Sequence, residues 1–303
     1  MRSVQLLAAT ALAIALSVTS AAAQKKYDIG ATDTEIKIGQ TVPFSGPASA
    51  YAGIGKTQAA YMKMINDQGG INGRKLNLIQ YDDAYSPPKA VEQVRKLVEG
   101  DEVLFTFQII GTPSNAAVQK YLNARKVPQL LASTGASRFS DPQNAPWTIA
   151  FNPNYQSEGR IYAKYILANH PNAKIGIFYQ NDDLGRDYIA GLKSGLGDKA
   201  ASMIVAEVSY ELTDPTVDSQ IVKLKAASVD LLYDASTPKF AAQAIRKVAD
   251  LDWHPVHILD INASPVSATL KPAGLDISKG IISTNYGKDP ADPQWKDDPG
   301  VKA

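Results

Sequence analysis

Short apolar runs alternate with longer segments of helical periodicity along most of the chain, and this alternation constrains the fold more than any other feature. Ala52–Asp67, Tyr155–Asn169 and Pro238–Asp250 carry apolar residues at helical spacing. Strands separated by helices of about 10 to 15 residues imply right-handed crossovers and parallel sheets. The strands are expected at IKIGQTV, KLNLIQY, VLFTFQII, VPQLLAS, KIGIFYQ, MIVAEVSY, VDLLYDA and HPVHILD.

These units suffice for two sheets, and the series starts again after PWTIAFNPN. We therefore predict an α/β fold of two Rossmann-like lobes with parallel sheets, joined by a hinge near Phe151–Asn154. The first lobe is expected over residues 35–151 and the second over residues 152–278. Ligands of such sheets bind beyond the carboxyl ends of the strands. The residues that directly follow each strand are therefore the candidates for function.

Residues 1–23 have the layout of a secretory signal peptide. Arg2 supplies the positive start, Leu6 to Val18 form an apolar run, and Ala21 to Ala23 offer an A-x-A cleavage site. The run is too short for a transmembrane anchor, which needs roughly 20 apolar residues. We expect a soluble protein exported to the periplasm.

Composition removes several function classes. The chain has no cysteine, so it cannot form disulfides, thiolate metal sites, a cysteine nucleophile or a lipid-modified cysteine anchor. Cleavage after Ala23 would remove Arg2 alone among the charged residues and reduce Lys+Arg from 31 to 30, equal to the 30 Asp+Glu. A formally neutral chain has no general attraction for nucleic acid or anionic lipid, so no nucleic-acid partner is expected.

The stretch A50-Y-A-G-I-G-K-T57 approaches the nucleotide-binding pattern G-x-x-x-x-G-K-[ST], with Ala50 in place of the first glycine. Pro43 and Pro47 separate it from the preceding strand and stiffen the chain away from a phosphate-wrapping loop. An exported protein also meets little ATP or GTP. A dinucleotide site is disfavoured too, because the first strand is not followed by G-x-G-x-x-G, although Asp82 and Asp83 end the second strand.

Signs of catalysis or of a bound metal are sparse. The three histidines are His170, His254 and His257, and a zinc site needs at least three converging ligands. No G-x-S-x-G elbow is present. Asp182 and Asp183 are an open alternative as a general base pair, but solvent-facing loop carboxylates are commoner. We expect no enzyme activity, cofactor or metal.

Hydroxyl-bearing and small residues follow several strands. Thr112, Ser114 and Asn115 open a helix, where free N–H groups and the positive dipole end favour an anion. Ser133, Thr134 and Ser137 follow the next strand. Together they suit a carboxylate, although each alone is also a typical helix cap.

Tyrosines and amides complete the candidate site. Tyr51, Tyr155 and Tyr233 fall in or beside loops at the expected crevice. Each offers an apolar ring with a polar hydroxyl. Asn181 and Asn262 follow strands of the second lobe and supply polar partners.

The chain resembles the periplasmic binding proteins of ABC importers, in the branched-chain amino-acid-binding group with the type I Venus-flytrap fold. The resemblance runs from about Ile36 to the end of the chain. It rests on SGPASAYAGIG, INDQGGINGRKLNLIQYDDAYSPPKAVEQVRKLV, GTPSNAAVQKYLNARKVP, STGASRFSDP and NYQSEGRIYAKYIL. In that family the loops after strands three and four hold the ligand's carboxylate, which implies Thr112 to Asn115 and Gly135, Ala136 and Ser137 here. The tyrosine that covers the ligand corresponds to Tyr51.

Two departures bear on the ligand. Amino-acid binders of this group usually carry an acid in the second lobe that pairs with the ligand's ammonium, and Asn262 stands there. A tyrosine common in that lobe is replaced by Leu184. An ammonium group without a buried anion is bound less well. The resemblance therefore implies the subgroup that binds carboxylic acids lacking an amino group, often aromatic acids.

Family members continue for more residues than this chain, so residues 279–303 are expected to be a truncated return segment towards the first lobe. The predicted function is a monomeric, periplasmic substrate-binding component that delivers a small carboxylate to an ABC permease in the inner membrane. The alternatives are a branched-chain amino-acid-binding protein and a periplasmic ligand sensor of a signalling system.

Overall fold

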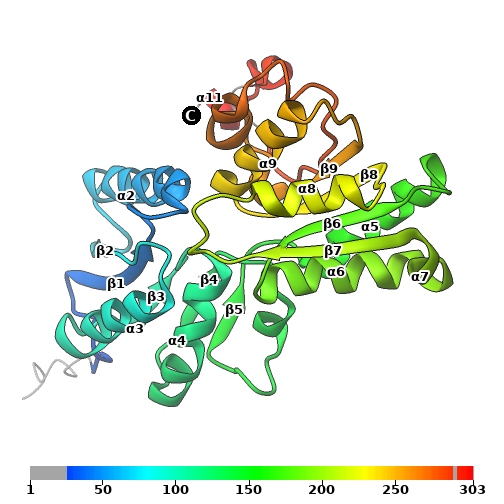
Figure 1. Cartoon of the computed structure of the whole chain (residues 1–303). Coiled ribbons are helices and arrows are strands. Elements are labelled where there is room, and N and C mark those ends of the chain that lie inside the picture. Colours follow the sequence, from blue (N-terminus) through cyan, green and yellow to red (C-terminus); the bar gives the residue numbers. More distant parts are fainter. Residues whose placement is uncertain (1–25, 289–291, 303) are drawn as a thin grey trace, which may run out of the picture.

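Two lobes, each built on a parallel sheet with flanking helices, make up the structure (Figure 1), and this confirms the predicted α/β fold. The computed structural model describes residues 26–288 and 292–302. The expected signal peptide, residues 1–23, lies outside them. The chain passes from the first lobe to the second between β5 and α5.

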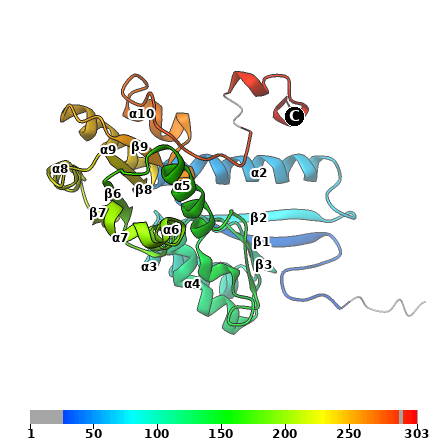
Figure 2. The same cartoon turned by 90° about the vertical axis from the view of Figure 1, so that its right-hand side faces the viewer.

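The first lobe has five parallel strands in the order β2-β1-β3-β4-β5. β1 and β2 pair without interruption, from Glu35 with Lys75 to Val42 with Asp82. Figure 2 shows α2 running along these two strands. The elements are β1 (Glu35–Val42), the 3-10 turn η2 (Ser49–Tyr51), α2 (Ala52–Asp67), β2 (Lys75–Asp82), α3 (Pro87–Arg95), the π turn η3 (Lys96–Gly100), β3 (Phe105–Phe107), α4 (Thr112–Arg125), β4 (Gln129–Ala132), the 3-10 turn η4 (Ser137–Ser140) and β5 (Thr148–Ala150).

The second lobe has four parallel strands in the order β7-β6-β8-β9. Its central strands β6 and β8 pair from Ile175 with Leu231 to Tyr179 with Ala235. The elements are α5 (Tyr155–Asn169), β6 (Ile175–Gln180), α6 (Asp183–Leu196), the 3-10 turn η5 (Gly197–Lys199), α7 (Ala200–Met203), β7 (Ile204–Tyr210), α8 (Asp218–Ala226), β8 (Leu231–Ala235), α9 (Pro238–Asp250), β9 (Val256–Leu259), η6 (Ile261–Ala263), η7 (Val266–Leu270) and α10 (Lys271–Ala273). The short helices η8 (Pro293–Trp295) and α11 (Pro299–Lys302) follow in the segment 279–303.

Two details of the first sheet were not predicted. The short edge strand β5 (Thr148–Ala150) escapes the sequence pattern because it has only three residues and its central Ile149 is exposed. The expected strand VLFTFQII is regular only over Phe105–Phe107, since Gln108 has a left-handed backbone with a φ of 50°. Leu131 on β4 is also left-handed, with a φ of 53°, and pairing resumes at Ile110 with Ser133. These two residues redirect the strand ends that lead into α4 and η4.

The start of the segment 279–303 lies at the edge of the second sheet. Ile282 N donates to His257 O at 2.9 Å, and Leu259 N donates to Ile282 O at 2.8 Å. The Thr284 hydroxyl donates to Glu158 Oε1 of α5 at 2.9 Å. A later return towards the first lobe, and the exact lobe limits 35–151 and 152–278, stay predictions.

Candidate functional site

A cavity of about 490 Å³ lies between the lobes at the carboxyl ends of their strands. Both lobes contribute to its wall, as expected for a ligand site in sheets of this kind. The lining residues are Ala50, Tyr51, Gly53, Ile54, Gln58, Tyr85, Gln108, Ile110, Gly111, Thr112, Ser133, Phe151, Asn152, Tyr155, Leu184, Ile261, Asn262, Pro265, Ser267, Ala268 and Tyr286.

The first lobe places hydroxyls and the start of α4 at this cavity. Thr112 is the first residue of α4, and its Oγ1 lies 2.8 Å from Thr134 Oγ1. The first N–H groups of a helix have no partner within it, and the positive dipole end is directed outward. Ser133, at the end of β4, lines the same wall. This wall therefore presents hydrogen-bond donors to an anion, and in the part of the chain that the structure describes it has no buried positive charge beside them.

Two tyrosines connect this wall to the second lobe. Tyr51 Oη donates to the backbone oxygen of Asn262 at 3.1 Å, and Tyr155 Oη donates to Asn262 Oδ1 at 3.5 Å. The Tyr155 ring stacks on Tyr188, with 4.7 Å between centroids. Burial raises the pKa of both Tyr51 and Tyr155 above the ordinary value. Both hydroxyls therefore stay protonated at neutral pH.

The second-lobe wall presents an amide in front of a carboxyl group. Asp260 is fully buried, and its Oδ1 accepts from Asn262 N at 2.8 Å and from Asn262 Nδ2 at 2.9 Å. Its other oxygen accepts from Ser236 N at 2.9 Å. Burial, together with the charges of Glu158 and Asp234, raises the pKa of Asp260 well above its usual range. Asn262 lines the cavity, whereas Asp260 lies buried behind it and does not.

The structure brings together four of the ten predicted site residues: Tyr51, Thr112, Tyr155 and Asn262 line the cavity. Ser114 and Asn115 are fully buried behind it. Asn115 Nδ2 donates to the backbone oxygens of Ile109 and Gly111, at 2.7 and 2.8 Å, so its amide stabilises the loop before α4. This contact is not a helix cap, because Asn115 lies inside α4 and donates to backbone oxygens, and α4 has no side-chain cap bond.

The remaining predicted residues are also engaged away from the cavity. Gly135 packs so closely on Tyr155 that a Cβ would stand 2.6 Å from its ring, and Ala136 N donates to Thr134 Oγ1 at 3.1 Å. Asn181 Nδ2 donates to Glu211 at the surface. None of these three residues, nor Ser137, lines the cavity. Tyr233, also expected at the crevice, is wrong as a site residue, because its side chain is fully buried in the core of the second lobe.

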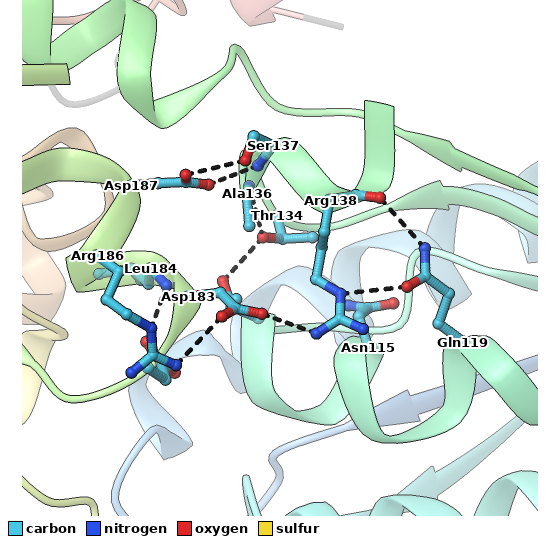
Figure 3. A network of polar contacts seen from close by, with 12 residues as sticks. Asn115, Gln119, Thr134, Ala136, Ser137, Arg138, Asp183, Leu184, Arg186 and Asp187 are labelled. Atoms are coloured by element: carbon cyan, nitrogen blue, oxygen red, sulfur yellow. Dashed lines mark hydrogen bonds and ion pairs between the residues drawn. The ribbon is translucent and has the colours of Figure 1, made fainter. Parts of the chain in front are cut away.

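Ser137 takes part in a polar contact between the lobes (Figure 3). Its backbone N and its Oγ donate to the two carboxylate oxygens of Asp187 on α6, at 2.5 and 2.9 Å. Next to it, Arg138 forms an ion pair with Asp183 at 2.8 Å. In this arrangement the loop after β4 binds a carboxylate of the protein itself.

Sequence reasoning missed Tyr85, Gln58 and Gln108. Tyr85 follows β2, where only the acidic pair Asp82–Asp83 was weighed. Tyr85 has a left-handed φ of 59°, and its ring fits against Gly111, where a Cβ would stand 2.1 Å from it. The rule that strand ends carry the site points to Tyr85 and Gln108, but not to Gln58, which lies on α2. The rule also does not show which side chains face the cavity.

Asp83, from the acidic pair that ends β2, is engaged by neighbouring groups of the protein. Asp83 is buried and accepts from Thr41 Oγ1 and Tyr85 N, both at 2.9 Å, so it stabilises the turn after β2. Within residues 26–288 and 292–302, no group of three or more His, Asp or Glu side chains is arranged to hold a metal ion. Across the same residues, every helix is too short or too polar to cross a membrane.

Comparison with known proteins agrees with this architecture. A family model described as periplasmic binding protein matches residues 35–298, so the chain belongs to the periplasmic binding protein family.

Among curated relatives, the Leu/Ile/Val-binding protein homolog 1 of Brucella abortus is 25% identical over 268 residues, which cover 87% of this chain and 70% of the relative. A leucine-, isoleucine-, valine-, threonine- and alanine-binding protein of Pseudomonas aeruginosa is 26% identical, covering 84% of this chain and 67% of the relative. These relatives are named as binding proteins, not as enzymes.

Solved structures share the fold. A possible leucine/isoleucine/valine-binding protein from Rhodopirellula baltica superposes with a TM-score of 0.77 at 22% identity, covering 89% of this chain and 72% of that one. A fatty acid ABC transporter substrate-binding protein from Thermomonospora curvata gives a TM-score of 0.73 at 21% identity, covering 91% and 69%.

Proposed function

We propose that this chain is exported to the periplasm, where it captures a small organic acid between its lobes for an ABC permease. The observation that carries the proposal is the second-lobe wall. Asn262 faces the cavity, and the oxygens of Asp260 behind it accept bonds from Asn262 and Ser236. An α-ammonium would meet no exposed carboxylate there, whereas the hydroxyls and helix start of the first lobe suit an anion.

The names of the relatives point to two ligand classes. Branched-chain amino acids are named for the Brucella and Pseudomonas proteins, and fatty acids for the Thermomonospora protein. The Asn262 wall favours an acid without an amino group, aromatic or aliphatic. A branched-chain amino acid is the second candidate, supported by those relatives' names.

Two matched ligand pairs separate these candidates by calorimetry. 4-Methylpentanoate differs from leucine, and 3-phenylpropanoate from phenylalanine, by the α-amino group alone. We expect at least one amino-free acid to bind about tenfold or more tightly than its amino-acid partner, because its complex leaves no ammonium unpaired. Tighter leucine binding would favour the second candidate, and no heat with any of the four would count against both.

A substitution in the first-lobe wall tests the carboxylate position. Thr112→Val keeps the side-chain shape and removes the hydroxyl, so the acid that binds should lose roughly tenfold in affinity. Thr213→Val changes an exposed threonine in the same way and should leave affinity unchanged. Equal affinities for the two variants would place the carboxylate elsewhere in the cavity.

A further inference from the structure

Four glutamine side chains form a continuous hydrogen-bonded chain in the first lobe, and we refer to Gln80, Gln40, Gln58 and Gln108 as the glutamine relay. Gln80 lies on β2, Gln40 on β1, Gln58 on α2, and Gln108 directly after β3. The relay leads from the sheet to the cavity wall, where Gln58 and Gln108 are lining residues. Carboxylate capture at Thr112 does not use it.

Two backbone carbonyls fix the direction of the relay. Gln80 Nε2 donates to Gly55 O at 2.8 Å, so its amino end is identified, and it also donates to Gln40 Oε1 at 2.7 Å. Gln40 Nε2 donates to Gln108 O at 2.9 Å and to Gln58 Oε1 at 2.5 Å. Amide orientation is normally assigned from such networks. Here a carbonyl can only accept, so neither Gln80 nor Gln40 can be reversed without losing its bond.

This direction reaches the last member of the relay. Because Gln58 Oε1 accepts from Gln40, its Nε2 is left to donate, and it donates to Gln108 Oε1 at 3.1 Å. The side-chain oxygen of Gln108 therefore accepts the bond from Gln58, and its Nε2 remains available to donate. Within residues 26–288 and 292–302 no hydrogen bond donated by Gln108 Nε2 is found, and Gln108, which is only 6% exposed, lines the cavity.

The backbone at Gln108 is held in an uncommon conformation. Its φ of 50° is left-handed, which few residues other than glycine, asparagine and aspartate adopt. The bond from Gln40 Nε2 to its backbone oxygen, and the bond from Gln108 N to Leu130 O at 3.0 Å, hold this turn in place. Side chain and backbone are thus both fixed before a ligand arrives, which suits a recognition site.

The geometry points to a second polar subsite: Gln108 Nε2 donates to a hydrogen-bond acceptor on the ligand, apart from the carboxylate that Thr112 and Ser133 hold. This inference rests on the proposed function and narrows the ligand to a small organic acid that carries a second oxygen acceptor, such as a carbonyl group. An acid that displaces solvent from Gln108 Nε2 without offering an acceptor leaves this donor unpaired in the complex. Leaving a donor unpaired is costly, so such an acid should bind more weakly than the loss of one hydrogen bond alone would predict.

Ligand pairs that differ by one acceptor test the inference directly on the full mature chain. Pentanoate is compared with 4-oxopentanoate, and benzoate with 3-formylbenzoate and 4-formylbenzoate, all by calorimetry. At least one carbonyl-bearing acid should bind about tenfold or more tightly than its parent. If the parent acids bind and no carbonyl-bearing acid exceeds its parent by about threefold, the second subsite is wrong and carboxylate capture stands. If no acid binds, both proposals fail.

Variants then assign the preference to the relay. Gln108→Glu keeps an oxygen for Gln58 and removes the amide donor, so the preference for the carbonyl-bearing acid should fall to about one. Gln58→Met leaves Gln108 in place but removes the group that orients it, and should reduce the preference only in part. Gln143→Glu makes the same change as the first variant at an exposed position and should preserve the preference.

Thermal unfolding of each variant, measured beside the titrations, reports whether the fold is retained. The ratio of the two affinities is the readout, because a general loss of binding leaves it unchanged. An undiminished ratio in folded Gln108→Glu would overturn the assignment, and so would an equal loss in Gln143→Glu. If Gln108→Glu does not fold, the ratio in Gln58→Met decides.

Discussion

The two lobes bury their sheets in different ways. In the second lobe, Ile177 and Tyr233 pack with α5 and α6 on one face, while Phe178 and Leu232 pack with α8 and α9 on the other. In the first lobe, one face of the sheet is covered by the apolar cluster of α3 and α4. The helix α2 on the opposite face buries only Gly55 and Met62.

Polar and close backbone contacts hold α2 where apolar packing is thin. Gly55 lies so near β1 that a Cβ would stand 2.7 Å from Val42 Cγ2. Asn66, near the end of the helix, donates to Leu76 O at 2.8 Å and accepts from Leu76 N at 2.7 Å. The exposed fractions of Tyr61 and Met64 are 60% and 42%. The comparison teaches that apolar packing covers both faces of the second sheet, whereas in the first lobe specific polar and backbone contacts hold α2, which carries Gln58 of the cavity wall.

The largest expected effect contrasts one aromatic residue from each lobe. Phe178→Ala removes a fully buried ring between the sheet and α8 and should lower the free energy of unfolding by about 3–5 kcal/mol. Tyr61→Ala, on the exposed side of α2, should change it by less than about 0.5 kcal/mol. Urea denaturation of both variants measures the difference, and similar losses would show that α2 is packed as tightly as the second lobe.

Two carboxylates, Asp182 in the second lobe and Asp82 in the first, should change the free energy of unfolding in opposite directions as the pH changes. Burial raises the pKa of Asp182, at the start of α6 in the second lobe, to about 6 from an ordinary 3.8. The folded state therefore holds this proton more tightly than the unfolded state between these values. The free energy of unfolding that Asp182 contributes increases as the pH falls from about 6 towards 4, by about 1–3 kcal/mol, and decreases as the pH rises.

Asp82 in the first lobe is partly buried, but bonds from the Ser45 hydroxyl and the backbone N–H groups of Ala84 and Ser45 outweigh that burial and lower its pKa. Its stabilising contribution is present at neutral pH and is lost as the pH falls below 3.8 through the lowered value. Urea denaturation between pH 3 and 7 tests both signs. Relative to the wild type, Asp182→Ala should be less destabilised at pH 7 than at pH 4, and Asp82→Ala more destabilised at pH 7 than at pH 3. The same trend for both variants would contradict the contrast.

The smallest expected change in the free energy of unfolding comes from the hydrogen bonds between α2 and β2. Asn66→Ala removes two hydrogen bonds to Leu76 and should cost about 1–2 kcal/mol. We expect the amides of α2 to exchange faster with solvent while those of β6 and β8 keep their rates. Asn169→Ala, at the exposed end of α5, serves as the matched control. Uniformly faster exchange in both lobes would mean that α2 does not open on its own.

The fold followed from the sequence because buried parallel strands and their crossover helices leave a strong pattern. The two sheets and the class of fold were predicted correctly, whereas β5 was missed because three half-exposed residues carry too little signal. Tyr51, Thr112, Tyr155 and Asn262 were expected at the cavity and line it, although their role in binding stays a prediction.

The rest of the site depends on backbone conformations that composition does not reveal. Tyr85 and Gln108 reach the cavity from left-handed turns at the ends of β2 and β3, and neither residue type signals such a turn. Ser137 was predicted as a site residue but does not line the cavity. Its position after β4 was recognised, but its bonds to Asp187 come from a helix 50 residues further along the chain.

The central claim is that an amide, not a carboxylate, forms the second-lobe wall of a site for an organic acid. Calorimetric titration of the wild type and Asn262→Asp with 4-methylpentanoate and leucine tests it most directly. We predict that the wild type binds 4-methylpentanoate more tightly than leucine, and that the new carboxylate shifts the ratio towards leucine by about tenfold or more. Tighter binding of leucine by the wild type, or a ratio that Asn262→Asp leaves unchanged, would contradict the account.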